Sequence, residues 1–200
     1  MTTWNVTEDK ILTREEINSI IADLKRKARR TALAARHLIL FRLSCCCGLR
    51  VSEICNLRLA DVNIERKQLK VNKGKGGKDR VVPIHWDQGT LDDLAAWKDR
   101  RKAEGAKPKD YYIITRKGTR LDRAAARRSF QSACGCLGKE RADALTIHHG
   151  RHSFVSHALD GGKNIVEVQR AAGHSNVATT SIYCHLVNGD QTVGNLFGST

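Results

Sequence analysis

The stretch that decides the fold is TALAARHLILFRLSCCCGLR, residues 31–50. It predicts a helix over residues 31–47 that is apolar on most faces, through Leu33, Leu38, Leu40, Phe41 and Leu43. A helix that is apolar on nearly all sides is buried, whereas a surface helix keeps a polar face. Gly48 ends the pattern, as glycine does after many helices. We therefore predict a central core helix, with Arg50 held firmly just beyond its end.

The segments beside this helix show two different periodicities. Residues 13–30 predict an amphipathic helix that opens with a capping box from Thr13 to Glu16. Ser52 is a suitable cap for a short helix that carries Glu53. The apolar period then changes to two in QLKVN and DRVVPI, which flank KGKGG at residues 73–77. This pattern predicts a β-hairpin with a tip rich in glycine and lysine.

The rest of the chain predicts more helices than strands. The expected elements are a helix over 90–104 with Leu91, Leu94 and Trp97 inward, a short strand over 111–115, a helix over 122–137, and helices over 146–186 broken at Gly161–Gly162 and Gly173. The fold class is therefore mixed α/β, mainly α-helical, with a small antiparallel β-sheet.

Composition limits the class of protein. Two hundred residues with 40% apolar content suit one folded domain. No apolar run approaches the roughly 18 residues of a membrane span, and the start is polar, so we expect no membrane partner and a cytoplasmic location. The seven cysteines include three in a row but no CxxC pair, which disfavours a disulfide framework and a zinc ribbon.

The net charge points to nucleic acid. Lysine and arginine number 35 against 21 acidic residues, which gives a formal charge of +14. Such an excess is expected of a protein that binds phosphate backbones. Any single run, such as KRKARR at 25–30, reads equally well as a solvated helix face. Basic clusters recur at 72–80, 98–102, 115–120 and 122–128, and this recurrence favours double-stranded DNA as the partner.

Four interpretations fit the segment HHGRHSF, residues 148–154: a metal site, a nucleic-acid contact, a catalytic cluster or ordinary surface. His148 and His152 are four residues apart, as helical zinc ligands are, but no HExxH glutamate or spaced cysteine pair accompanies them. His148 also lies one helical turn before Arg151, so both side chains project from one face. We predict no metal.

Six residues together supply the chemical groups that phosphoryl transfer without a metal requires: Arg50, Lys75, His148, Arg151, His174 and Tyr183. A phosphodiester under attack gathers negative charge on its non-bridging oxygens, and guanidinium groups match those oxygens with charged hydrogen bonds. A tyrosine can act as a covalent nucleophile when cations stabilise its phenolate. The departing sugar oxygen needs a general acid, which lysine or histidine can supply.

These residues lie in boxes that resemble those of the tyrosine recombinases, the phage integrase family. The boxes are GLRVSEICNLRLADV, GKGGKDRVVPI, HHGRHSF, AGHS and TTSIY, in the family's order and near its spacing over residues 11–186. One box alone carries little weight, but the set is highly specific. The resemblance implies a site-specific recombinase or integrase that cleaves and rejoins DNA through a 3′-phosphotyrosine, without any cofactor.

The resemblance also implies a role for each residue. Arg50, His148 and Arg151 bind the scissile phosphate, His174 supports it, Lys75 is the general acid, Tyr183 is the nucleophile, and Glu53 orients the site by holding Arg50 or His148. Each role has a structural alternative. Arg50 suits a salt bridge to Glu53 at the helix end, and Tyr183 suits a half-buried residue with its hydroxyl at the surface.

Three other histidines receive no catalytic role. We predict a structural position for His152, an orientation away from Arg151 for His157, and an exposed or DNA-backbone position for His149. Gly150 and Ala172 stand where the family usually has leucine, and both are expected to loosen the local packing.

The resemblance implies that residues 1–200 are a single catalytic domain, with a core over about 11–186 and a tail over 187–200. Family members usually carry a separate core-binding domain first, and only 49 residues precede Arg50 here. A minimal enzyme and a fragment both fit. Four protomers around two duplexes are expected on DNA, with the chain associated with the nucleoid. A type IB topoisomerase-like activity and a DNA-binding regulator without catalysis remain alternatives.

Overall fold

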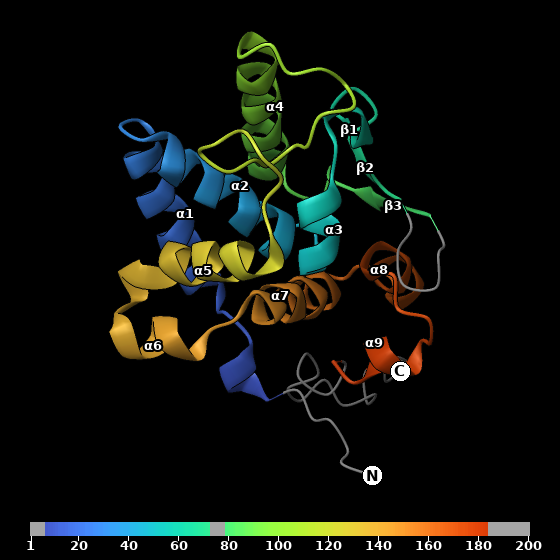
Figure 1. The fold of residues 1–200 in the computed structure, drawn as a ribbon. Coiled ribbons are helices and arrows are strands. Elements are labelled where there is room, and N and C mark those ends of the chain that lie inside the picture. The colour runs from blue at the N-terminus through green and yellow to red at the C-terminus, as the bar shows by residue number, and fades with distance from the viewer. Residues whose placement is uncertain (1–6, 73–78, 184–200) are drawn as a thin grey trace, which may run out of the picture.

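A computed structural model describes residues 7–72 and 79–183 of the chain. Figure 1 shows its elements, which in chain order are η1 (Glu8–Lys10), α1 (Arg14–Ala28), α2 (Ala32–Cys45), α3 (Val51–Asn56), η2 (Leu59–Asp61), β1 (Val62–Asn63), β2 (Gln68–Val71), β3 (Arg80–Pro83), α4 (Gln88–Ala103), α5 (Arg123–Ala133), η4 (Cys134–Leu137), α6 (Lys139–Ala144), α7 (Ile147–Asp160), α8 (Ile165–Ala172) and α9 (Ala178–Ser181). Helices dominate, and the three strands form one antiparallel sheet. The predicted fold class is confirmed.

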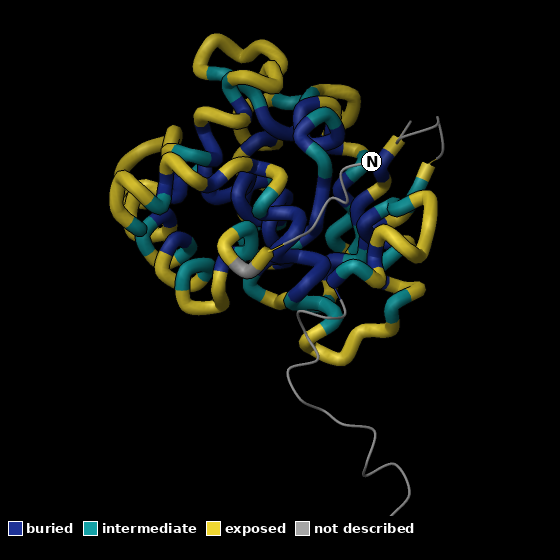
Figure 2. Tube along the Cα trace, turned by 90° about the horizontal axis from the view of Figure 1, so that it is seen from below, coloured by how far each residue is buried: buried dark blue, intermediate teal, exposed yellow. Residues whose placement is uncertain are grey.

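Helix α2 is the core helix that its composition predicts. Every residue from His37 to Cys45 is buried, and α1, α3, α4, α5 and α7 all pack against it. Figure 2 shows these buried segments in the interior, with exposed turns around them. Leu33 departs from the prediction because it lies in the first turn and is 52% exposed. Gly48 ends the segment with φ +64°, and a Cβ there would lie 2.3 Å from the Phe154 ring.

The predicted N-terminal cap is present in α1 but not in α3. Thr13 and Glu16 form the predicted capping box of α1. Ser52, however, does not cap α3, because it lies inside the first turn. Arg50 is the cap residue, and its backbone N–H donates to Glu53 Oε2 at 2.7 Å. The glutamate thus supplies the reaching-back half of a capping box, and no hydroxyl is required.

The predicted hairpin is present in β2 and β3. Leu69 pairs with Val82 and Val71 with Arg80, so these four residues share one face of the sheet. Leu69, Val71 and Val82 are buried on that face, whereas Val81 on the other face is 51% exposed. Strand β1 extends the sheet on the far side of β2.

The strand predicted over 111–115 is wrong. Tyr111 and Ile114 make only isolated bridges, with Arg58 and Arg120. The polar groups of Tyr112 instead bind elsewhere: its hydroxyl donates to Leu94 O at 2.6 Å, and its carbonyl accepts from Trp97 Nε1 at 2.8 Å. Tyr112, one of the aromatic residues that suggested a strand, therefore packs this loop onto α4.

Helix α7 crosses α2 at very short range. A Cβ on Gly150 would lie 2.3 Å from Ser44 Oγ and 2.8 Å from Cys45 Sγ. Ser44 Oγ also donates to Ile147 O at 2.9 Å, which joins the two helices inside the core. The expectation that Gly150 loosens the packing is thus wrong, since only glycine allows this approach. The helix breaks after Asp160 and at Gly173 are confirmed.

The other helices match their predictions closely. Leu91, Leu94 and Trp97 are buried on α4, and the helix expected over 122–137 is α5 followed by the 3-10 turn η4. All six cysteines within the described ranges are free. Among residues 7–72 and 79–183, no helix combines the length and the apolar character that crossing a membrane requires.

Candidate active site

The predicted site residues meet where α3, α7 and the turns after α8 and α9 come together. Arg50 and Glu53 open α3, His148 and Arg151 lie in the first turns of α7, and His174 and Tyr183 follow α8 and α9. Figure 1 shows α3, α7 and α8 next to one another on the side where β3 reaches α8. Lys75 lies outside the described residues, so its role remains a prediction.

Arg50 makes the predicted ion pair and a second contact. Its Nη1 donates to Glu53 Oε1 at 3.0 Å, and its Nη2 donates to Gly173 O at 2.7 Å. The side chain is 23% exposed, so it faces solvent at one edge. The salt bridge is therefore only part of what Arg50 does, because the same guanidinium also reaches the turn that carries His174.

Glu53 binds arginine rather than histidine. Burial raises the pKa of its carboxyl, but the hydrogen bonds and charge of Arg80, together with those of Arg50, outweigh burial and hold the pKa below its ordinary value. Glu53 is thus a carboxylate at neutral pH. Arg80 was not among the predicted site residues.

Arg151 is the least satisfied charge in the site. Its Nη1 donates to Gly48 O at 2.6 Å, while its Nη2 has no hydrogen-bond partner in the described part of the chain. The residue is only 7% exposed. Burial and the charge of Arg50 lower the pKa of Arg151 to about 9, so it remains protonated at neutral pH. A buried charged donor without an acceptor is costly, so an anionic oxygen that accepted from Nη2 would stabilise this arrangement.

The two predicted histidines are uncharged at neutral pH. His148 lies on the exposed side of α7, where partial burial and then the charges of Arg127 and Arg151 lower its pKa. His174 Nδ1 is hydrogen-bonded to Thr180 Oγ1 at 2.9 Å. Burial, Arg151 and Arg50 lower the pKa of His174 to about 3. Neutral imidazoles can hydrogen-bond a phosphate or move a proton without adding charge.

Tyr183 is buried, contrary to the alternative with its hydroxyl at the surface. It is 2% exposed, and its hydroxyl is hydrogen-bonded to His152 Nδ1. Burial raises the pKa of Tyr183 to about 12, against the opposing charge of Arg151. Burial and nearby His149 and His148 lower the pKa of His152 to about 4. A neutral imidazole therefore touches a protonated phenol, a pair in which the imidazole can accept the proton.

The remaining histidines have other contacts. His157 Nε2 is 2.7 Å from Leu12 O, so its ring contacts the segment just before α1. His149 is half-buried, and its Nδ1 accepts from Thr146 N at 3.2 Å. In the described ranges, no three histidine, cysteine or acidic side chains are grouped as metal ligands would be.

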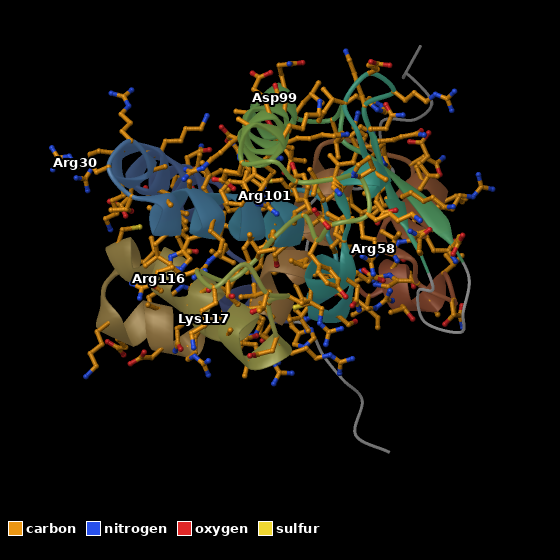
Figure 3. All side chains as sticks on the ribbon, turned by 45° about the horizontal axis from the view of Figure 1, so that its top comes forward. Arg30, Arg58, Asp99, Arg101, Arg116 and Lys117 are labelled. Atoms are coloured by element: carbon orange, nitrogen blue, oxygen red, sulfur yellow. The ribbon has the colours of Figure 1, made fainter. Side chains whose placement is uncertain are left out.

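Exposed basic side chains lie near α3 and α5. Arg127 of α5 is exposed and lies near enough to lower the pKa of His148. Figure 3 shows Arg58 beside α3 and Arg116 and Lys117 near α5, and all three residues are exposed. Arg58 also lies over the Tyr111 ring, 4.6 Å from its centroid. Of these residues, Arg127 adds positive charge beside His148.

Fold and site together describe a mainly helical domain in which two arginines, two histidines and a tyrosine lie within electrostatic reach of one another. The sequence pattern of the phage integrase family matches residues 10–189. The chain belongs to this family, which confirms the resemblance.

Relatives with curated names support the assignment. Tyrosine recombinase XerA of Thermococcus kodakarensis is 35% identical over 174 residues, which are 87% of this chain and 57% of XerA. Tyrosine recombinase XerC of Corynebacterium glutamicum is 37% identical over 141 residues, 70% of this chain and 44% of XerC. The chain thus spans about half the length of these relatives.

Solved structures show the same fold. The crystal structure of XerA recombinase aligns with a TM-score of 0.71 at 28% identity, covering 88% of this chain and 60% of that one. The Tn1549 transposon integrase in complex with transposon right end DNA also gives 0.71, over 90% of this chain and 63% of that one. Its 19% identity makes it a likeness of fold alone.

Proposed function

We propose that this chain is a site-specific DNA recombinase that cleaves and rejoins strands through a covalent 3′-phosphotyrosine on Tyr183. The observation that carries the proposal is Arg151, a buried guanidinium near Arg50 whose Nη2 has no partner among residues 7–72 and 79–183. A phosphodiester of DNA supplies an anionic oxygen for that donor. Tyr183 lies within the electrostatic reach of Arg151, as a nucleophile must lie close to the bound phosphate.

In the first step, Tyr183 Oη attacks phosphorus and the bond to the 5′ oxygen breaks. The negative charge that builds on the non-bridging oxygens is stabilised by Arg50 and Arg151, with His148 and His174 as further hydrogen-bonding groups. The contact between Tyr183 and His152 supports His152 as the acceptor of the phenol proton. Lys75 gives its proton to the departing 5′ oxygen, as the family resemblance implies.

In the second step, a 5′ hydroxyl attacks the phosphotyrosine, the Tyr183 phenolate leaves, and a phosphodiester is restored. One ester replaces another in each step, so no high-energy cofactor enters the balance. If the attacking 5′ hydroxyl comes from a second duplex, the strands are exchanged. We further propose that four protomers assemble on two duplexes for this exchange and that the chain is nucleoid-associated. In this proposal residues 1–200 act as one catalytic domain.

Covalent trapping tests the proposal directly. The protein is incubated with nicked duplexes from DNA flanking its own gene, in which the cleaved 5′ end diffuses away, and is then denatured. We expect a DNA-linked band with the wild type and with Tyr111→Phe, and none with Tyr183→Phe. Tyr111 is a matched control because its ring lies under Arg58, outside the site.

Other outcomes point to the alternative functions. An adduct with relaxation of supercoiled DNA but no strand exchange would favour a type IB topoisomerase-like activity. Tight, sequence-specific binding without an adduct on any flanking duplex would refute the recombinase and favour a regulator. An adduct that survives Tyr183→Phe would refute Tyr183 as the nucleophile.

A further inference from the structure

Arg80 enters the site from the β-sheet. It pairs with Val71 across β2 and β3 and lies two residues before Val82, so strand alternation directs its side chain to the buried face. Val71 and Val82 on that face belong to the core, and the Arg80 side chain is 12% exposed. A charged group on a core face requires partners that satisfy it.

Its partners come from two helices. Arg80 Nη1 donates to Glu53 Oε1 at 2.6 Å and Nη2 donates to Glu53 Oε2 at 2.8 Å, which is the bidentate fork of arginine on a carboxylate. Arg80 Nε donates to Ala171 O at 3.0 Å. One side chain thus joins the hairpin to α3 and to the end of α8.

The Glu53 carboxylate is shared between two arginines. Besides the Arg80 fork, Oε1 accepts from Arg50 Nη1 at 3.0 Å and Oε2 accepts from the Arg50 backbone N–H at 2.7 Å. Four donors therefore fix one carboxylate. The charges of Arg50 and Glu53 alone would cancel, whereas Arg80 brings the trio to a net charge of +1. Its presence leaves Arg50 attractive to a phosphate.

Gly173 is shaped by the same side chain. The glycine has φ +68°, and a Cβ there would lie 2.8 Å from both Cδ and Nε of Arg80. The Gly173 carbonyl accepts from Arg50 Nη2 at 2.7 Å. The turn that carries His174 therefore packs against the Arg80 side chain and is hydrogen-bonded to Arg50. A side chain at Gly173 would displace one of these arginines.

We propose that Arg80 is a positioning residue for DNA cleavage: it neutralises Glu53 and supports the Gly173 turn, so that Arg50 keeps both its place and its charge for the scissile phosphate. This inference rests on the proposed recombinase function. Arg80 itself contacts Glu53 and the α8 backbone, and it acts on the phosphate through Arg50.

The test measures single-turnover formation of the Tyr183 adduct with Arg80→Gln, Arg80→Lys and the double variant Arg80→Gln/Glu53→Gln. We expect Arg80→Gln to slow cleavage about 100-fold, which is the size of effect seen when one transition-state donor is lost. Arg80→Lys retains the charge but not the fork, so a loss of about 10-fold is expected. Arg66→Gln, an exposed arginine in the turn between β1 and β2, is the matched control and should cleave normally.

The double variant distinguishes an electrostatic role of Arg80 from a purely structural one. If Arg80 serves to neutralise Glu53, removing the Glu53 charge from Arg80→Gln returns the net charge near Arg50 to +1, and cleavage recovers about 5-fold or more. Purely structural losses would instead add, and the double variant would be slower than Arg80→Gln. That result, or an Arg80→Gln enzyme at the wild-type rate, would overturn the proposal.

Two further measurements keep the outcomes distinct. DNA carrying a 5′-bridging sulfur needs no general acid, so it should rescue Lys75→Ala but leave Arg80→Gln slow. Rescue of Arg80→Gln would show that Arg80 acts on the acid and not on Arg50. If the wild type forms no adduct at all, the proposed function fails. Calorimetric binding of inorganic sulfate then decides on Arg80: weakening by Arg80→Gln with recovery in the double variant supports it, and unchanged binding refutes it.

Discussion

Arg42 and Arg151 are both buried arginines, but they differ in whether negatively charged groups compensate their positive charge. Arg42 is 5% exposed and Arg151 is 7% exposed. Arg42 donates to Asp93 Oδ2 and to Asp87 Oδ2, both at 2.9 Å, and to Thr90 Oγ1 at 3.2 Å. Arg151 donates to a single carbonyl oxygen and has an Nη2 without a partner in the described chain.

The pKa values of the two residues differ in the same sense. Burial alone would lower the pKa of Arg42, but Cys46 and the carboxylates Asp93 and Asp87 raise it above its ordinary value. Burial and the charge of Arg50 lower the pKa of Arg151 to about 9, and Glu53 only partly opposes them. The charge of Arg42 is therefore compensated by carboxylates within the fold. That of Arg151 has no carboxylate hydrogen-bonded to it in the described chain, so it can bind an anionic ligand.

The largest expected effect concerns Arg42. Arg42→Gln removes the ion pair with the half-exposed Asp87 and leaves Asp93 with Lys25 alone as its cation. The buried end of this cluster is broken, so a loss of about 3 kcal/mol of unfolding free energy is expected, the lower end of the range for a buried pair. Urea denaturation followed by tryptophan fluorescence measures the loss. An unfolding free energy within about 1 kcal/mol of the wild type would show that the Arg42 cluster does not hold the fold together.

Arg151→Gln is expected to show the reverse pattern. Cleavage should fall about 100- to 1000-fold, because a donor to the transition-state charge is lost. The unfolding free energy should stay the same or rise, since an uncompensated buried charge is removed. Adduct formation and urea denaturation on the same preparation give both numbers. A destabilisation as large as that of Arg42→Gln would remove the distinction between the two arginines.

Acid should destabilise the Arg151 region selectively. Burial holds the pKa of His152 at about 4 and that of His174 at about 3, both below the value in an unfolded chain, and Arg151 adds to both shifts. The unfolded chain therefore takes up protons first, and the stability that is complete above about pH 6.5 is lost as the pH falls toward 4. Arg151→Gln should reduce the loss between pH 7 and pH 4 by about 1 to 2 kcal/mol, because the folded histidines bind protons only near their own lowered pKa values.

Urea denaturation at the two pH values measures this difference. Arg42→Gln is the control, because Arg42 does not contribute to the shifts of His152 or His174. An equal acid sensitivity in the wild type and Arg151→Gln would mean that Arg151 and these histidines do not share one electrostatic environment.

Local patterns were enough to predict most of the fold. The apolar run of α2, the capping box at Thr13 and the alternation of β2 and β3 each lie within one element, where side-chain spacing is directly readable. The prediction of a strand over 111–115 failed because Tyr112 packs on α4, a contact that short-range propensity does not encode.

The site was predictable only as far as the family boxes reach. They named Arg50, Arg151, His174 and Tyr183, which the structure brings together. Arg80 and His152 also lie inside these boxes, but their contacts were missed because the partners are distant in sequence: Arg80 lies 27 residues from Glu53, and His152 lies 31 from Tyr183. Strand alternation places Arg80 on the inner face, but the choice of its carboxylate depends on how α3 and β3 pack.

The smallest expected effect tests directly whether Arg151 awaits an anion. Sulfate at about ten times its dissociation constant should stabilise the wild type by about 1.4 kcal/mol, which is RT times the logarithm of eleven. For a chain of this size, that corresponds to a rise of about 3 to 5 °C in the melting temperature.

Sulfate also stabilises proteins through exclusion from their surface, so the variants must separate the two contributions. Exclusion acts equally on the wild type, Arg42→Gln and Arg151→Gln, whereas site binding requires the Arg151 donor. The wild type and Arg42→Gln should therefore gain the same extra rise in melting temperature over Arg151→Gln, saturating with sulfate concentration. A rise that is linear in sulfate and identical in all three proteins would mean that Arg151 holds no anion, and its unpartnered Nη2 would then be a cost of the fold rather than a binding site.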